Sequence, residues 1–454
     1  MGTEVLEERK KSILTKDFCC SGDGSGISCE KASVSGSVSQ RACVYCGARV
    51  VLNPITDAYH IVHGPIGCAS YTWDIRGSLT SGSTIFRNSF STDLRERDVI
   101  FGGAKKLTAA IDEIVQQESP RLIFVYATCI VGVIGDDVEA VCREAEEKYG
   151  IRVIAVKAPG FSGTKTLGYK MACNALMQLI RPHAGQVDKT KRHGINILGD
   201  FNLAGEMWII QNYFKHIGID VISTFTGDAS YDTLIKAPTA ALNIVQCAGS
   251  SAYLANEMEE EFGIPFLKVS FFGVEDTTNS LLRVAYAIGD AKTIRLTEEF
   301  TSSESGKAEL FLKKYRPHLE GRRAAIYVGG GFKAISLIRQ FNEMGIRTVV
   351  VGTQTGKQED YEVIRTLVDE DTVILDDANP AELERFMQEQ HADILVGGVK
   401  ERPLAYKLGI AFCDHNHERK HALGGYEGVR NFTQEINLSI NSPVWECLRP
   451  AAGL

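Results

Sequence analysis

The feature that most constrains the fold is a regular alternation of short apolar runs with longer amphipathic stretches, which begins near residue 98 and continues almost to the end of the chain. Short apolar runs bounded by turn residues are typical of strands buried on both faces, and the longer stretches repeat apolar residues at helical spacing. Strands and helices that alternate in this way form parallel sheets covered by helices. We therefore predict an α/β protein built from doubly wound parallel sheets.

The individual elements follow from the same pattern. The expected strands cover residues 121–129, 152–157, 195–199, 219–225, 241–247, 265–270, 324–328, 347–351, 371–375, 393–396 and 409–413. The expected helices cover residues 104–117, 136–149, 204–216, 250–262, 276–288, 297–319, 333–343, 359–368, 380–389 and 401–407, with one more that follows Gly163 to about 181 and a C-terminal one from about 426.

A chain of 454 residues is too long for one ordinary core, so several domains are expected. The first 40 residues are polar, rich in Ser and Gly, and lack periodicity, which indicates a flexible arm. The polar stretch 186–192 marks a boundary between two α/β units, and a charged helical connector leads into a third. The expected division is an arm 1–40, a first α/β domain 41–190 joined by 425–454, a second domain 191–295, and a connector helix with a third domain over 296–424.

Composition excludes several classes of protein. The net charge of −8 leaves no basic surplus for a nucleic acid, and no apolar run is long enough to span a membrane. The charged N-terminus lacks the apolar core of a signal peptide, so we expect a cytoplasmic protein. In that compartment the twelve cysteines are expected to be thiols, some of them metal ligands, rather than disulfides.

Three cysteines stand at positions suited to metal binding. Cys68 lies in a turn shaped by glycine and proline within residues 60–77, Cys129 ends the apolar run 122–129, and Cys43 begins a Cys-x-x-Cys pair with Cys46. The carboxyl ends of parallel strands are where open α/β folds place their ligands, so these thiols could share one iron–sulfur cluster. A cubane takes four thiolates, and the fourth would come from Cys46 or from another chain. A structural turn with one buried cysteine is the alternative.

Other stretches also carry side chains or turns suited to ligand binding. Cys247 follows a buried strand, which places it at the carboxyl edge of a sheet. The loop 412–421 gathers a thiol and three imidazoles, and Gly329-Gly330-Gly331 precedes a helix whose first N–H groups can bind an anion. The stretch 352–358 has the wrong spacing for a phosphate-binding P-loop, so ATP hydrolysis is not expected of this chain. Cys19, Cys20 and Cys29 in the arm are more readily explained as incidental thiols.

Several ordered motifs together resemble one known family. They are Cys-x-x-x-Gly at 43–47, His-Gly-Pro-Ile-Gly-Cys at 63–68, Thr-Cys-Ile-Val-Gly-Val-Ile-Gly-Asp-Asp at 128–137 and Val-Gln-Cys at 245–247. From about residue 40 to the end, the chain resembles the nitrogenase component 1 superfamily. Among its members it is most similar to the scaffold proteins on which the iron–molybdenum cofactor is matured. The resemblance implies three Rossmann-like domains of the component 1 type and a C-terminal helix.

The resemblance also implies site residues. Cys43, Cys68 and Cys129 would hold a [4Fe-4S] cluster at a subunit interface, and Cys247 would hold one end of an iron–sulfur–carbide precursor of the cofactor. Further positions matching the cofactor pocket of the family are Arg76, Lys400, Gly330, Gly331, His415 and Asn416. Lys400 matches a lysine that meets homocitrate, although a surface ion pair is an equally good explanation for it.

Two departures from catalytic nitrogenase separate this chain from an enzyme that reduces dinitrogen. Asn416, next to His415, stands where the catalytic proteins carry the histidine that grips the far end of the cofactor. Thr164 to Tyr169 replaces a segment in which the catalytic proteins carry a glutamine and a histidine near the cofactor. A cluster held at one end can be modified and passed on, so the expected function is cofactor assembly, with molybdenum and homocitrate in transit.

The resemblance further implies the partners. They are a NifN-type subunit in an α2β2 heterotetramer, a dimeric ATP-dependent iron protein, and proteins that deliver and receive the cofactor. Three alternatives stay open at this point: a nitrogenase-like reductase such as one that cleaves carbon–sulfur bonds, the vanadium-system counterpart of the scaffold, and an interaction protein without metal.

Overall fold

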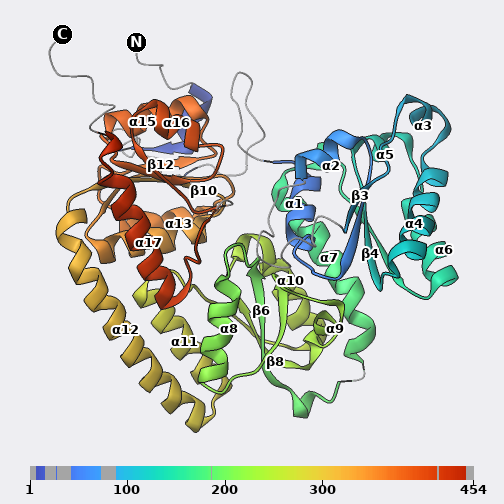
Figure 1. The fold of residues 1–454 in the computed structure, drawn as a ribbon, viewed down its shortest axis with the longest axis horizontal. Helices are drawn as coiled ribbons and strands as arrows, with labels where there is room; N and C mark the ends of the chain where they lie inside the picture. Colours follow the sequence, from blue (N-terminus) through green and yellow to red (C-terminus); the bar gives the residue numbers. More distant parts are fainter. Residues whose placement is uncertain are drawn as a thin grey trace. The chain divides into compact units, whose positions relative to one another are not determined.

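The computed structural model describes residues 7–15, 27, 42–72, 88–185, 187–416 and 419–445. The chain divides into two compact units, which are described separately (Figure 1). One unit comprises Ala42–Val269 and Tyr286–Thr293, and the other comprises Met1–Arg41, Ser270–Ala285 and Ile294–Leu454. The described strands form three sheets. Neighbouring strands within each sheet are parallel, apart from the short edge strand β1 (Ile13–Leu14), which is antiparallel to its neighbour. The predicted α/β class with parallel sheets is confirmed.

The first sheet of the Ala42–Val269 unit has the order β3-β2-β4-β5. Its strands are β2 (Ala58–His63), β3 (Ser89–Ser91), β4 (Leu122–Ala127) and β5 (Arg152–Lys157). Every residue of β4 is buried, and its side chains alternate between the two faces. Phe124 and Tyr126 pack with α1 (Val44–Leu52) and α7 (Lys165–Ala184), whereas Ile123 and Val125 pack with α4 (Ala104–Glu118) and α6 (Val138–Tyr149). The unbroken apolar run of β4 is therefore explained by helices that cover both faces of the sheet.

The second sheet of the same unit has the order β7-β6-β8-β9. Its strands are β6 (His193–Asp200), β7 (Val221–Thr226), β8 (Ala240–Val245) and β9 (Phe266–Lys268). The helices that accompany it are α8 (Glu206–His216), α9 (Tyr231–Leu234) and α10 (Ala248–Phe262). One apolar core contains residues of both sheets, among them Phe124 of β4 and Val245 of β8, so the two sheets belong to one packed unit.

The other unit carries a six-stranded sheet of order β1-β12-β11-β10-β13-β14. Its strands are β1 (Ile13–Leu14), β10 (Arg323–Val328), β11 (Arg347–Thr353), β12 (Val373–Asp376), β13 (Ile394–Gly397) and β14 (Ala411–Asp414). Its helices are α13 (Gly331–Met344), α14 (Gln358–Leu367), α15 (Pro380–Glu389), α16 (Arg402–Lys407) and α17 (Gly425–Ile440). The strand order reverses between β10 and β13, the point at which open α/β sheets place a ligand crevice.

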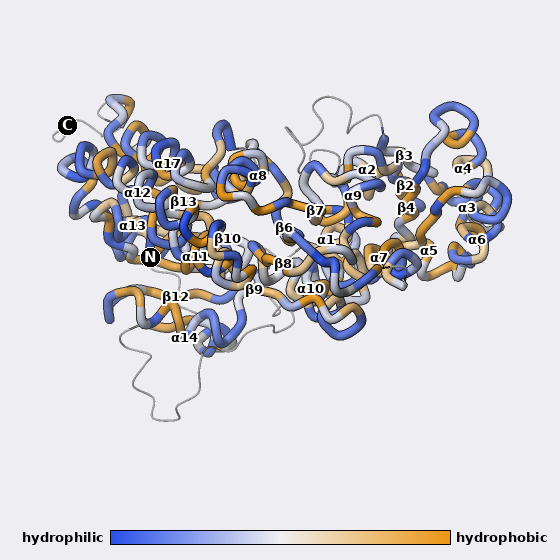
Figure 2. The backbone as a smooth tube through the Cα atoms, turned by 90° about the horizontal axis from the view of Figure 1, so that it is seen from below, coloured by the Kyte–Doolittle hydropathy of each residue, from blue (hydrophilic) through white to orange (hydrophobic). Residues whose placement is uncertain are grey.

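Two long helices, α11 (Val274–Ile288) and α12 (Ala291–Leu319), follow β9 in the chain. The latter contains the charged connector expected at 297–319, and it begins six residues earlier than expected. In Figure 2 the tube through helices such as α4 and α6 changes between hydrophilic and hydrophobic residues within single turns, as expected for helices with one buried face. No described helix is long and apolar enough to cross a membrane.

The expectation of a flexible arm over residues 1–40 is wrong for the part that the structure describes. Glu7–Ser12 forms a 3₁₀ helix, and β1 pairs with β12 through Ile13 opposite Leu375. Ile13 is buried, and the buried Arg9 side chain bonds Glu382, with Nε 3.0 Å from Oε1. A two-residue strand is too short to leave a periodic signal, so only its partner strand reveals it.

The C-terminal helix exists as predicted but packs elsewhere than expected. We expected residues 425–454 to join the first domain, whereas the structure groups α17 with the six-stranded sheet. The Phe432 ring lies 5.7 Å from that of Phe341 of α13, and the Tyr426 hydroxyl lies 2.8 Å from that of Thr278. The amphipathic pattern defines which face is buried but carries no information about which sheet receives it.

Candidate metal centre

Three cysteines reach the same edge of the β3-β2-β4-β5 sheet from three different segments. Cys129 is the first residue of α5 (Cys129–Ile134), directly after β4, and Cys68 lies in the first turn of α2 (Ile66–Thr72), shortly after β2. Strands β2 and β4 are parallel neighbours whose last pair is His63 with Ala127, so both segments leave the sheet at its carboxyl edge. Cys43 precedes α1 as its N-cap residue, and its side chain makes no capping hydrogen bond.

Gly160, which follows β5, lies next to two of these sulfurs. Its backbone N–H donates to Cys129 Sγ at 3.1 Å. A Cβ atom at Gly160 would lie 3.0 Å from Cys129 Sγ and 3.6 Å from Cys43 Sγ, so both sulfurs lie against the same glycine. A side chain at this position would crowd Cys129 Sγ and Cys43 Cβ, the latter at 3.2 Å.

The third sulfur, that of Cys68, lies near the other two. Burial raises the pKa of the Cys68 thiol, a hydrogen bond with Thr128 lowers it, and the nearby Cys129 and Cys43 raise it further. The three thiols are thus close enough to repel one another when ionised, an effect that bound iron would offset. No group of three or more His, Cys, Asp or Glu side chains in the described part of the chain is spaced to hold a single metal ion. A cubane makes a different demand, because each of its thiolates binds a separate iron atom.

Cys46 lies one turn further along α1 and is buried. Its side chain bonds the hydroxyl of Tyr71 on α2, the helix that carries Cys68. Burial raises the pKa of Tyr71 to about 12, with further contributions from Cys46 and Cys43. Cys46 therefore lies beside the three-thiol cluster rather than in a remote part of the core.

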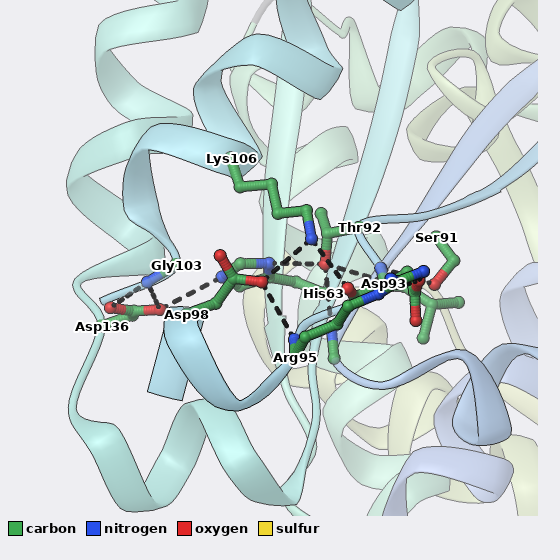
Figure 3. Close-up of polar contacts among 11 residues, drawn as sticks. His63, Ser91, Thr92, Asp93, Arg95, Asp98, Gly103, Lys106 and Asp136 are labelled. Carbon is green, nitrogen blue, oxygen red and sulfur yellow. Dashed lines mark hydrogen bonds and ion pairs between the residues drawn. The ribbon is translucent and has the colours of Figure 1, made fainter. Parts of the chain in front are cut away.

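A polar network around His63 and Asp136 connects the segments that follow β2 and β4 (Figure 3). His63 Nδ1 lies 3.0 Å from Thr92 Oγ1, and its Nε2 lies 3.4 Å from Asp136 Oδ2. Gly103 N–H donates to both oxygens of Asp136, at 3.1 and 2.9 Å. The Thr128 hydroxyl donates to the His63 carbonyl at 3.1 Å, which links the turn before Cys68 to the segment of Cys129. Burial lowers the pKa of His63, while Asp136 opposes this effect.

The sequence motifs alone do not reveal this network. His63 and Asp136 both stand inside motifs that were noted for their cysteines, but histidine and aspartate in a glycine-rich turn have many possible roles. The useful signal is positional, since His63 ends a buried strand five residues before Cys68 and Asp136 follows Cys129 by seven.

The first turn of α1 is positioned by close contact with α7. A Cβ atom at Gly47 would lie 2.1 Å from the Lys165 carbonyl oxygen, and one at Gly168 would lie 2.0 Å from the Val44 carbonyl oxygen. The two helices therefore pack backbone against backbone, which only glycine permits at these two positions. Cys43 and Cys46 are fixed by this contact.

Cys247 is placed apart from the three-thiol cluster, at the carboxyl edge of the second sheet. It follows β8, precedes α10 as its N-cap residue and is half-buried. Gly199 has a φ of 85°, and a Cβ atom there would lie 2.8 Å from the Cys247 backbone nitrogen. The thiol thus occupies the strand-end position that the sequence predicted.

At the carboxyl edge of the six-stranded sheet, several of the predicted residues contact other residues of the same unit. Gly330 is the N-cap of α13, and a Cβ atom at Gly331 would lie 2.4 Å from Asp360 Cβ. Lys333 Nζ donates to the His415 carbonyl at 2.5 Å and to Asn416 Oδ1 at 3.4 Å. Lys400 is exposed, beside a buried Glu401 that accepts a hydrogen bond from Gly398 N–H at 2.8 Å.

His415 and Asn416 have different surroundings. The His415 ring is fully buried between Phe272 and Phe432, with ring centroids 5.0 and 5.5 Å away. Among the described residues neither of its ring nitrogens has a hydrogen-bond partner, and burial holds its pKa well below the ordinary value. Asn416 is partly exposed, and its backbone N–H donates to Asp414 Oδ1 at 2.8 Å. Adjacent positions thus place one side chain in the apolar core and the other near the surface.

Some predicted residues lie outside the described part of the chain. They are Arg76, Cys19, Cys20, Cys29 and His417.

Comparison with known proteins identifies the class. Residues 43–441 match the model of the nitrogenase component 1 type oxidoreductases. The chain belongs to this family. It also matches a solved structure of nitrogenase Cp1 at pH 6.5 with a TM-score of 0.88 and 28% sequence identity, covering 98% of this chain and 97% of the other. The α/β fold of the component 1 type, with parallel sheets and a C-terminal helix, is therefore confirmed.

Curated relatives are more similar in sequence. The nitrogenase iron–molybdenum cofactor biosynthesis protein NifE of Clostridium pasteurianum is 66% identical over 450 residues, which is 98% of this chain and 97% of that protein. The NifE protein of Methanosarcina barkeri is 50% identical over 454 residues, covering 98% of both chains. The similarity predicted from the motifs near residues 63, 128 and 245 thus extends over nearly the whole chain.

Proposed function

We propose that this chain is a scaffold subunit on which the nitrogenase iron–molybdenum cofactor is matured. The observation that carries the proposal is the convergence of Cys43, Cys68 and Cys129 on one edge of a sheet, in a chain 66% identical to a protein named for the biosynthesis of that cofactor. Soft thiolates that meet in one place are the donor set that iron–sulfur clusters require.

The three thiols would hold a [4Fe-4S] cluster whose fourth thiolate comes from a NifN-type partner. Large apolar side chains on the same segments support a partner at this place. Ile66 on the helix of Cys68 is 57% exposed, Val133 on the helix of Cys129 is 71% exposed, and Phe161 next to Gly160 is 65% exposed. Exposed apolar groups clustered around a polar site are typical of an interface between subunits. By analogy with the family, the assembly would be an α2β2 heterotetramer.

Cys247 would anchor the iron–sulfur–carbide precursor while molybdenum and homocitrate are added. A thiol at a strand end that precedes a helix is well presented to a ligand. Lys400 is exposed and would offer its ammonium group to homocitrate. Asn416 is a weaker iron ligand than the histidine of catalytic nitrogenase, so the precursor would be held firmly at one end and could be released. Arg76 would add positive charge beside it.

The remaining partners follow from the same role. Electrons would come from an ATP-dependent iron protein, and other proteins would deliver the precursor and receive the finished cofactor. We place the protein in the cytoplasm, where reduced thiols are stable.

The test is anaerobic purification of the chain with its partner, followed by iron and sulfide analysis and EPR. A scaffold loaded with precursor, and given molybdate, homocitrate, the iron protein and ATP, should release a cofactor that activates cofactor-free nitrogenase. A nitrogenase-like reductase would instead retain its cluster and consume substrate. A protein containing neither iron nor sulfide would contradict both functions.

A further inference from the structure

Cys46 has no role in the proposed cluster, yet it lies within the same short turn of helix as Cys43. Cys43 is the N-cap residue of α1 and Cys46 is its third helical residue. Helix geometry places the Cα atoms of residues three apart about 5 Å from one another. Natural disulfides span roughly 4.4 to 6.8 Å between Cα atoms, so the backbone here needs little adjustment to join the two.

The two sulfurs also face the same neighbour. The Tyr71 hydroxyl bonds the Cys46 side chain, and Cys43 is near enough for its charge to raise the pKa of Tyr71, so this residue of α2 neighbours both cysteines. Neither cysteine is in a disulfide in this structure, and Cys43 is partly exposed whereas Cys46 is buried. An outer thiol at a helix start with an inner one a turn behind it is the arrangement used for reversible thiol–disulfide exchange.

We propose that Cys43 and Cys46 form a reversible disulfide in the cluster-free chain, and that this bond closes the thiol site until a reductant opens it. The gating consequence rests on the proposed function, because a Cys43 sulfur bonded to Cys46 cannot bind iron. The disulfide itself does not depend on that function. It forms before a partner subunit covers the site.

The chemistry balances with a small-molecule disulfide, such as oxidised glutathione, as the oxidant. The Cys43 thiolate attacks one sulfur of oxidised glutathione, which releases one glutathione thiol and leaves a mixed disulfide. The Cys46 thiolate then attacks Cys43 Sγ and expels the second glutathione. Two protein thiols are oxidised, one external disulfide is reduced to two thiols, and a dithiol reductant reverses the process.

The sequence around the pair permits a direct readout. Trypsin cleaves after Arg41 and Arg49, so the peptide 42–49 contains Cys43 and Cys46 and no other cysteine. The full-length chain is freed of iron with a chelator, equilibrated with oxidised glutathione, alkylated, digested and analysed by mass spectrometry. The expected product is an unalkylated peptide two hydrogen atoms lighter than the dithiol form. Dithiothreitol should convert it fully to the doubly alkylated peptide.

Two variants separate this outcome from general oxidation. In Cys46→Ser, oxidised glutathione should leave a stable glutathione adduct on Cys43. Cys142→Ser, which removes a buried thiol on α6, should behave like the wild-type chain. Glutathione adducts on Cys43 of the wild-type chain, or two alkylated cysteines after oxidation, would overturn the proposal.

Iron binding tests the gate separately. Reduced wild-type protein should take up iron and sulfide, the oxidised form should take up at least tenfold less, and dithiothreitol should restore uptake. Cys46→Ser should bind iron normally when reduced. Equal uptake by the oxidised and reduced forms would overturn the gate, whereas failure of the reduced form to bind iron would overturn the proposed function and leave the disulfide readout standing.

Discussion

Two edges of parallel sheets in this molecule, one in each unit, use their polar side chains in opposite ways. At the edge that carries Cys43, Cys68 and Cys129, the three thiols lie near one another, and hydrogen bonds through His63 and Asp136 fix the neighbouring backbone. At the edge of the six-stranded sheet, the polar groups satisfy one another, as Lys333 does with the His415 carbonyl. The first arrangement brings together thiols that bound iron would join, whereas the second holds several of its polar groups in hydrogen bonds within the chain.

The largest effect is expected from the thiol edge itself. Cys68→Ala should abolish the proposed [4Fe-4S] cluster, because a cubane loses stability when one of its thiolates is removed. Iron per chain and the EPR signal of the anaerobically purified complex provide the measurement. Cys142→Ala is the matched control, since burial raises the pKa of that thiol to about 12 and keeps it inert. Equal iron content in both variants would show that the three sulfurs do not share a cluster.

A smaller effect is expected from Glu343, in the unit of the six-stranded sheet. Its carboxylate accepts hydrogen bonds from the N–H groups of Val274 and Glu275 at the start of α11, both at 2.9 Å, and burial raises its pKa from 4.5 to about 7. Because the folded state binds this proton more tightly than the unfolded chain, the stabilisation is present below about pH 4.5 and is lost as the pH rises to about 7.

The unfolding free energy of the wild-type chain should fall by roughly 3 kcal/mol between pH 4.5 and 7 because of Glu343, at about 1.4 kcal/mol for each pKa unit. Glu343→Gln should remove this part of the pH dependence. Urea unfolding at pH 5 and pH 8 measures it. Comparing the two pH values cancels the cost of replacing one carboxylate oxygen by an amide. Glu309→Gln, at an exposed position on α12, should leave the pH dependence unchanged. An identical pH profile for Glu343→Gln and wild type would refute the assignment.

The network of His63, Gly103 and Asp136 should contribute less. Asp136→Ala leaves the Gly103 N–H without its acceptor and His63 without its carboxylate, which should cost about 1–3 kcal/mol of unfolding free energy. Asp136→Asn keeps one acceptor oxygen and should cost less. The same variants should bind iron with a broadened EPR signal, since the turn of Cys68 is less well fixed. A sharp wild-type signal in Asp136→Ala would show that the network does not position the site.

The smallest effect is expected at His415. Its ring lies between Phe272 and Phe432 with no hydrogen-bond partner among the described residues, so His415→Phe should change stability by less than about 1.5 kcal/mol. Thermal unfolding measures this, and the iron of the three-thiol site should be unaffected. His415→Asp serves as the contrast, because a buried carboxylate should destabilise strongly. A large loss in His415→Phe would indicate that the imidazole has a ligand.

The sequence contains most of the fold and only part of the site. Strands such as β4 and β10 were predicted within two residues because their apolar runs are unbroken. Strand β2 was not predicted, since the buried His60 and His63 interrupt its apolar pattern, and β1 is too short to leave one. Cys129 and Cys247 could be selected because each ends a predicted strand, whereas Cys68 was selected by its turn of glycine and proline and Cys43 by its spacing to Cys46. The network of His63 with Asp136 could not, because those residues are 73 positions apart and meet only in the folded chain.

The contact between α1 and α7 has a consequence for how the protein can fail. Gly47 and Gly168 each carry a hydrogen atom where any other residue would carry a Cβ atom, and neither position has room for one. A single methyl group at either position would wedge the helices apart and carry the Cys43 sulfur away from its companions. A chain with every cysteine intact would then fail to assemble the proposed cluster, so a replacement that damages the three-thiol site need not involve any atom that would touch metal.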